Sequence, residues 1–251
     1  RRLFRGHVHV DFNRIGRRSF VGNNALMPIG ADLGNNCLLG VLSVPPGGME
    51  SKMADDSEWL GSPPFELPHR QKVGGFDATE IYKPTLRLYA LRCLIDGLRI
   101  VLPIAIAMAA ATIFVAVAAT AIHYLPLWAE IALLPVVATS VVLGCAMSVV
   151  VLKRLLMGKF EPVIKPLWSV YVWNNELVNG IYEGLAAPML GVTLGTPFIC
   201  WYLRLLGCRI GKHVFLETEL FSEFDLVEIG DYAALGLGVV VQNHLFEDRI
   251  M

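Results

Sequence analysis

Two long stretches without a charged residue constrain the fold of this chain most strongly. "IVLPIAIAMAAATIFVAVAATAI" covers residues 100–122, and "IALLPVVATSVVLGCAMSVVVL" covers residues 131–152. Each exceeds the roughly 18 apolar residues that mark a candidate transmembrane helix. Only "HYLPLWAE" separates them, which predicts a tight transmembrane hairpin with Tyr124 and Trp128 at the membrane interface. The alternative is a buried helical core, but two such adjacent segments are difficult to accommodate in a water-soluble domain.

The basic residues that flank these stretches predict the orientation of the hairpin. The turn between the spans contains no Lys or Arg, whereas both outer flanks contain several. Because cytoplasmic loops are enriched in Lys and Arg, we expect a multi-pass protein of the plasma (inner) membrane with both chain ends in the cytoplasm. The flanking basic residues are Arg87, Arg92, Arg99, Lys153, Arg154, Lys159 and Lys165.

A third apolar stretch, residues 185–203, is interrupted by proline and glycine. If it crossed the membrane, Arg204, Arg209 and Lys212 would lie outside, against the same charge rule. We therefore expect a broken helix that lies on or dips into the cytoplasmic interface, so that membrane lipid is a partner of the chain.

An aliphatic residue returns every six residues near the start of the chain. The positions are Ile15, Val21, Met27, Leu33 and Leu39. Glycine or proline follows each of them, and a small residue stands four positions after each. Neither a helix nor a flat strand has this period, whereas a three-sided coil with one short strand and one corner per hexad does. The pattern predicts a left-handed parallel β-helix of the hexapeptide-repeat type.

The same spacing returns near the end of the chain, with one extra residue in "SEFDLVEIG". The positions are Ile210, Leu216, Ser222, Ile229, Leu235 and Val241. The predicted fold class is therefore mixed, with β-helix segments on both sides of a transmembrane hairpin. The expected zones are the end of a first β-helix domain (1–44), a Pro/Gly-rich connector (45–84), the hairpin (85–160), interfacial helices (161–209) and the start of a second β-helix domain (210–251).

Composition narrows the class of protein further. Hydrophobic residues make up 55% of the chain and charged residues 17%, which is more apolar than a usual soluble domain. The net charge of −1 provides no electrostatic support for a nucleic-acid partner. The scattered cysteines are expected to be buried free thiols, and no metal site is predicted. Because the chain lacks an initial Met and stops within a repeat, we expect a fragment of a larger chain, with homo-oligomerisation an open possibility.

Histidine is the first candidate for catalysis, because acyl transfer to an amine or hydroxyl needs a base near neutral pH. The chain has six: His7, His9, His69, His123, His213 and His244. His244 occupies an outward-facing position of its hexad and precedes two acids in "QNHLFEDR". Glu247 or Asp248 could orient or charge-stabilise its imidazole, and Arg249 could hold an anionic phosphate arm. Spacing alone favours a solvated or structural histidine over a catalytic one.

Three further residues are predicted to contact the substrate or its carrier. They are Asn243, Glu223 and Asp225. The last two lie in the irregular "SEFDLVEIG" segment.

The segment "FSEFDLVEIGDYAALGLGVVVQNHLFEDRIM" resembles the membrane-bound C-terminal region of the ε-poly-lysine synthetase family, which are nonribosomal-peptide-synthetase-like proteins. "WLGSPPFELPHRQ" and "WNNELVNGIYEGLAAPMLGVTLGTPFICWYLRLLGCRIG" fit the same family, so the resemblance spans nearly the whole chain. It implies a piece of the region that joins carrier-bound amino acids through amide bonds, with His244 as the motif histidine. The implied partners are upstream adenylation and thiolation domains, whose 4'-phosphopantetheine arm presents the thioester as substrate; no cofactor is expected to bind the chain directly.

Two other functions stay open at this level. One is a membrane-tethered hexapeptide acetyltransferase that uses acetyl-CoA and acts on a sugar or lipid. The other is a non-catalytic membrane scaffold or export component. The absence of ionisable residues from residues 100–122 and 131–152 disfavours a transport path through these spans.

Overall fold

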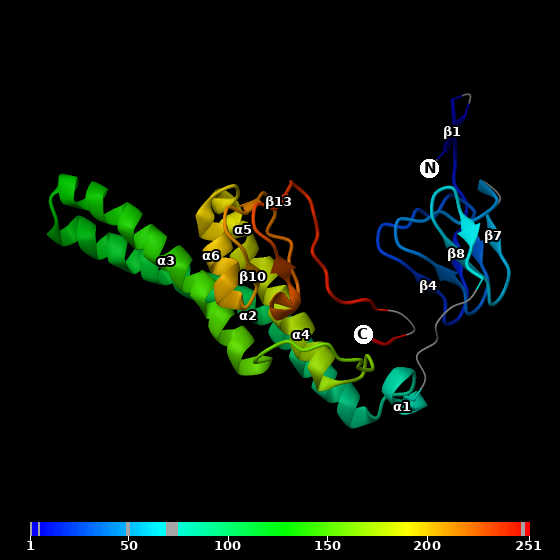
Figure 1. Ribbon diagram of the computed structural model, residues 1–251. Helices are drawn as coiled ribbons and strands as arrows, with labels where there is room; N and C mark the ends of the chain where they lie inside the picture. Colours follow the sequence, from blue (N-terminus) through cyan, green and yellow to red (C-terminus); the bar gives the residue numbers. More distant parts are fainter. Residues whose placement is uncertain (1, 5, 49–50, 69–74, 247–248) are drawn as a thin grey trace. The chain divides into compact units, whose positions relative to one another are not determined.

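The computed structural model describes all residues except 1, 5, 49–50, 69–74 and 247–248 (Figure 1). Its internal contacts divide the chain into two compact units, Arg1–Gly75 and Phe76–Met251. The first unit consists of short strands and turns, and the second contains all the described helices and the remaining strands.

Three small sheets make up the first unit. β1 (Arg2–Phe4) pairs antiparallel with β2 (His7–His9). β3 (Arg14–Ile15), β5 (Asp32–Leu33) and β7 (Lys52–Met53) form a parallel sheet. β4 (Phe20–Val21), β6 (Leu38–Leu39) and β8 (Glu58–Leu60) also run parallel, and β9 (Phe65–Glu66) adds an antiparallel edge.

The prediction of left-handed β-helix segments is wrong. The described strands are two or three residues long and form separate sheets of two to four strands, with no closed or curled sheet among them. The physical reason is that a residue with positive φ interrupts the chain after almost every strand, so each backbone ladder ends after a few hydrogen bonds. These residues include Arg18, Asn24, Asn36, Leu42 and Asp56.

The six-residue spacing nevertheless accounts for the first two parallel strand pairings of the first unit, while the next two are offset by 20 residues. Arg14 pairs with Asp32 and Phe20 with Leu38, an offset of 18 residues in both cases. Aliphatic residues from successive strands therefore meet in a small interior, where Leu33, Leu39 and Met53 are buried. Gly16 is required where the backbones approach, because a Cβ there would collide with the carbonyl of Gly34.

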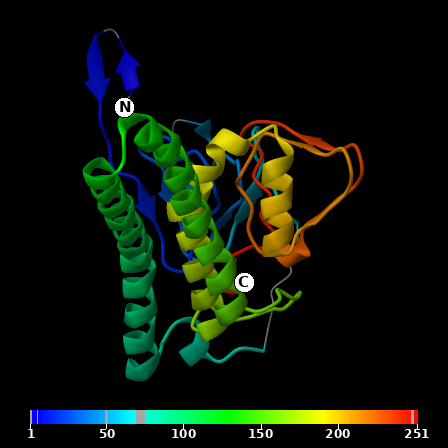
Figure 2. The same ribbon diagram turned by 90° about the vertical axis from the view of Figure 1, so that its left-hand side faces the viewer.

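Two antiparallel helices, α2 (Leu86–Tyr124) and α3 (Leu127–Leu156), form the longest elements of the second unit (Figures 1 and 2). Among the described residues, these two are long and apolar enough to cross a membrane by length and composition. They contain both predicted spans. Thr85 caps the start of α2, where its side chain accepts a hydrogen bond from the backbone N–H of Leu88.

Shorter helices follow and pack against this pair. α1 (Ala78–Ile81) precedes α2, and α4 (Val170–Ile181) contacts α2 and α3. A π-turn (Tyr182–Ala186) leads from α4 into α5 (Ala187–Leu190), and a 3₁₀ turn (Gly191–Thr193) leads on towards α6 (Pro197–Leu206). The stretch 185–203, predicted to be a broken helix, is thus divided between several helical elements.

The strands of the second unit lie after α6. β10 (Arg209–Ile210) pairs parallel with β12 (Glu228–Ile229), and β11 (Phe215–Leu216) pairs parallel with β13 (Ala234–Leu235). A 3₁₀ turn, η4 (Phe224–Leu226), separates β11 from β12. Helices and strands share one core whose largest fully buried side chains include Trp173, Tyr182 and Phe224.

The cysteines are free in both units. Cys93 is exposed, contrary to the expectation that all five are buried. The other four, Cys37, Cys145, Cys200 and Cys208, are buried. Cys93 lies on α2, where the helix leaves part of its surface uncovered by other described residues.

Candidate active site

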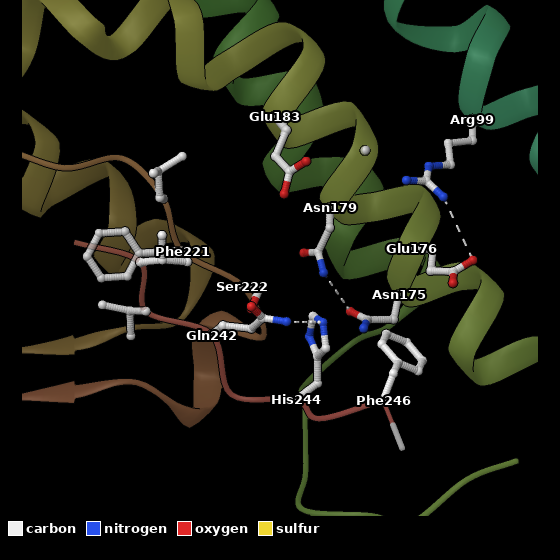
Figure 3. A pocket seen from close by; sticks show the side chains of 14 residues that line it. Arg99, Asn175, Glu176, Asn179, Glu183, Phe221, Ser222, Gln242, His244 and Phe246 are labelled. Carbon is white, nitrogen blue, oxygen red and sulfur yellow. Dashed lines mark hydrogen bonds and ion pairs between the residues drawn. The ribbon is translucent and has the colours of Figure 1, made fainter. Parts of the chain in front are cut away.

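A cavity of about 290 Å³ lies in the second unit between helices and the chain segments around Ser222 and His244 (Figure 3). One wall comes from a single face of α4 and the π-turn, with Asn175, Asn179 and Glu183 at successive four-residue steps. This spacing places the three side chains on the same side of the helix. The opposite wall comes from residues 220–222 and 240–242, with His244 and Phe246.

His244 and Glu223 form the central pair of this site. His244 Nδ1 lies 2.7 Å from Glu223 Oε1, and the two side chains are 15% and 2% exposed. A carboxylate is an acceptor only, so the Nδ1–H of His244 donates to it. Glu223 therefore fixes both the ring orientation and the tautomer of the neutral imidazole, with the lone pair on Nε2.

Glu223 is held by several other donors. Asn175 Nδ2 donates to Oε1 at 2.7 Å, Asn179 Nδ2 to Oε1 at 3.3 Å, and Ser222 Oγ to Oε2 at 2.6 Å. Burial alone would raise the pKa of Glu223, but the hydrogen bonds from His244, Ser222 and Asn175 outweigh it and lower the pKa below its ordinary value. The carboxylate is therefore ionised at neutral pH.

The backbone at Glu223 explains how its side chain reaches the interior. Its φ is 44°, in the left-handed region that is uncommon for a residue other than glycine. The residue directly precedes η4, where the regular repeat is interrupted. Such strained positions are concentrated at functional sites.

The second ring nitrogen of His244 lies beside Gln242. The Gln242 Nε2 and His244 Nε2 atoms are 2.8 Å apart, so the amide donates to the lone pair of the imidazole. Gln242 also lines the cavity (Figure 3). If a substrate N–H or O–H group displaced the Gln242 amide, it would donate its hydrogen bond to His244 Nε2. His244 would then be positioned to act as a general base.

A separate ion-pair cluster closes the side of the cavity next to α2. Glu176 Oε2 lies 2.6 Å from Arg92 Nη2 and 3.8 Å from Arg99 Nη1. Gly180 allows Arg99 to lie against α4, since a Cβ there would approach the Arg99 Nε to 2.8 Å. The negative charge of Glu176 is thus neutralised within the protein.

The other predicted site residues lie in different places. Asn243 Nδ2 donates to the backbone carbonyl of Ser222 at 3.2 Å and so fastens the segment next to His244. Asp225 is ion-paired with the buried Lys153 and accepts a hydrogen bond from the backbone N–H of Phe160. The guanidinium of Arg249 lies 5.3 Å from the ring centre of Tyr82. Glu247 and Asp248 lie outside the described residues.

Sequence reasoning did not assign Glu223 as the partner of His244. It also missed Asn175, Asn179, Ser222 and Gln242. Two signals pointed to them. Asn175 and Asn179 stand four apart in the stretch that forms α4, and the hexad repeat slips by one residue at Glu223. Among the described residues, no group of three His, Cys, Asp or Glu side chains could hold a metal ion.

Comparison with known proteins provides one relative. The chain is 37% identical over 247 residues to delta-poly-L-ornithine synthetase from Acinetobacter baumannii strain AB307-0294. The match covers 98% of this chain but only 18% of the relative. No family model and no solved structure matches the chain. The relative is a poly-amino-acid synthetase, which supports a synthetase-like role in general, while the ε-poly-lysine resemblance is not specifically supported.

Proposed function

We propose that this chain is the amide-bond-forming, acyltransferase-like part of a poly-amino-acid synthetase at the inner face of a membrane. The observation that carries the proposal is the His244–Glu223 pair, whose second ring nitrogen, Nε2, lies at a cavity of about 290 Å³. The synthetase relative supports the same class of reaction.

In the proposed reaction an amine attacks the carbonyl carbon of an aminoacyl thioester. His244 Nε2 accepts a proton from the attacking nitrogen, and Glu223 stabilises the imidazolium that forms. A C–N bond forms, the C–S bond breaks, and the leaving thiolate takes the proton from His244. The products are one amide and one free thiol, so the imidazole returns to its starting state.

The thioester would be presented on a 4'-phosphopantetheine arm by carrier domains elsewhere in the same polypeptide. Adenylation and thiolation domains are therefore the proposed partners. Arg249 and Asn243 remain candidates for contacts with the arm or its carrier. The chain spans 18% of the relative's length, which leaves ample room there for such domains.

The membrane arrangement is part of the proposal. α2 and α3 would cross the plasma membrane as a hairpin, and the basic flanks would keep the site on the cytoplasmic side. His244 and Glu223 lie in the same unit as this hairpin, outside the two long helices. Amide formation would then take place next to the membrane surface.

The test replaces His244 with Gln in the full-length polypeptide that contains this chain. Loading of the amino acid onto the carrier should continue, while amide product should fall by roughly 10²–10⁴-fold, the usual contribution of a general base. His213→Asn is the matched control, because His213 is exposed and has a φ of 55° that asparagine tolerates. Undiminished product from the His244 variant would refute the proposal.

A further inference from the structure

The amide of Asn179 leaves one buried acceptor directed into the cavity. Its Nδ2 donates to Asn175 Oδ1 at 3.2 Å and to Glu223 Oε1 at 3.3 Å. Both of these oxygens accept hydrogen bonds, so the amide nitrogen of Asn179 must face them and the flipped amide orientation is excluded. Asn179 is 8% exposed, and its Oδ1 has no hydrogen-bond partner among the described residues. Buried acceptors of this kind are rare unless a ligand or water satisfies them.

One carboxylate at the same cavity is also unengaged. Glu176 is neutralised by Arg92 and Arg99, and Glu223 is bound to His244. Glu183 is exposed, lines the cavity, and forms no hydrogen bond or ion pair within the part of the chain that the structure describes. It follows Asn179 by four residues, and the two side chains point the same way from the helix (Figure 3).

We propose that Asn179 Oδ1 and the Glu183 carboxylate bind the ammonium group of the acceptor substrate beside His244. This inference rests on the function proposed above, and it names the group that the site recognises. An ammonium ion carries three N–H donors and one positive charge. Two acceptors on one helix face, one of them charged, complement it, while the third N–H can point to His244 Nε2.

This arrangement addresses a chemical requirement of the reaction. An ammonium ion has no lone pair, so it becomes a nucleophile only after it loses a proton. Glu183 would hold the cation, while His244 Nε2 takes one ammonium proton and releases it to solvent. The free amine then attacks the thioester carbon, and His244 takes a second proton that passes to the leaving thiolate. Arg99, the remaining basic side chain at the cavity, is paired with Glu176 and so does not compete for Glu183.

Binding is measured first, without chemistry, in the full-length polypeptide carrying His244→Gln. The probe is radiolabelled L-ornithine, the amino acid in the relative's name, in equilibrium dialysis with carrier loading omitted. Adding Glu183→Gln should weaken binding about tenfold, the lower end of what a charge-assisted hydrogen bond contributes. Adding Glu217→Gln should leave binding unchanged, because Glu217 is exposed and does not line the cavity. Equal binding in the two double variants would overturn the assignment.

A kinetic measurement separates this inference from the proposed function. With His244 intact, Glu183→Gln should raise the half-saturating L-ornithine concentration about tenfold and leave the plateau rate within about twofold. Glu183→Asp retains the charge and should bind better than Glu183→Gln, which excludes a general folding defect as the cause. A lower plateau rate with unchanged half-saturation would reject Glu183 as the ammonium site. The His244→Gln result decides the general-base proposal independently.

Discussion

The repeat region of the first unit, residues 14–60, and that of the second unit, residues 209–241, share a spacing but depart from it at different places. Paired residues in the first lie 18 and then 20 apart, as Phe20 with Leu38 and Leu38 with Glu58 do, whereas the strand residues paired in the second lie 19 apart, as Phe215 and Ala234 do. The additional residue coincides with the turn that contains Glu223. The irregularity, rather than the repeat, therefore supplies the carboxylate of the candidate site.

The two regions also differ in what covers them. The interior of the first is filled by its own side chains, such as Leu33, Leu39 and Met53. The strands of the second pack into a core with helices, including Trp173 of α4 and Leu203 of α6. The strand repeat supplies mainly small and aliphatic side chains, whereas the adjacent helix α4 supplies the polar side chains of Asn175 and Asn179. The contrast teaches that the site needs both kinds of element.

Replacing Glu223 tests the functional half of this comparison and should have the largest effect. In Glu223→Gln the amide can no longer stabilise an imidazolium, and Asn175 and Asn179 lose their charged acceptor. We expect amide formation to fall by roughly 10²-fold or more, as for loss of a general base. Product formation at a fixed carrier-loading level measures this. Asp55→Asn is the counterpart in the first region, and its product formation should equal that of the wild type.

Replacing Leu33 tests the structural half. Leu33 is fully buried in the first unit, and Leu33→Ala should cost about 2–5 kcal/mol in the free energy of unfolding through lost contacts and a residual cavity. Chemical denaturation measures the change, and Leu26→Ala, at a side chain that is 64% exposed, is the control. Amide formation per folded molecule should persist. A Leu33 variant that is stable but inactive would show that the first region contributes to the site directly.

The helical part of the fold follows from local sequence. Long charge-free stretches predict helices, because a segment inside a lipid bilayer must satisfy its backbone hydrogen bonds internally. Thr85 and Pro126 are the residues directly before α2 and α3. The hexad spacing predicts the first two strand pairings, through the 18-residue offset, but not the later ones, which are offset by 20 or 19 residues. It does not predict how sheets end, because that depends on turn residues such as Arg18 and Leu42 adopting positive φ, which their side chains do not favour.

The site was predicted only in part, for a physical reason. His244 is recognisable because histidine suits proton transfer and acids follow it in sequence. Its partner in the structure is Glu223, 21 residues earlier, reached through a left-handed turn. Asn175 and Asn179 come from a helix still farther away. Contacts between such distant segments depend on tertiary packing, and no local spacing encodes them.

Each region contains one carboxylate, Asp55 in the first and Glu223 in the second, that should make the stability of the fold depend on pH. We expect this effect to be smaller than those of the substitutions above. Hydrogen bonds from the backbone and side chain of Asn35 lower the pKa of the exposed Asp55, and the pKa of buried Glu223 is lowered by its donors against the effect of burial. Both groups therefore stabilise the fold above their ordinary pKa, which for Glu223 is 4.5. As the pH falls below that value, the unfolded chain takes up a proton that the folded chain does not, and stability decreases.

Unfolding measured between about pH 3 and pH 6 reveals the contribution of each group. Glu223→Gln has no proton to take up there, so its loss of stability with falling pH should be less steep than that of the wild type. Asp55→Asn should flatten the profile less, because water screens an exposed carboxylate and weakens its hydrogen bonds. If Asp55→Asn changed the slope more than Glu223→Gln, the network around Glu223 would not hold the carboxylate ionised, and the His244 pair would lose its electrostatic basis.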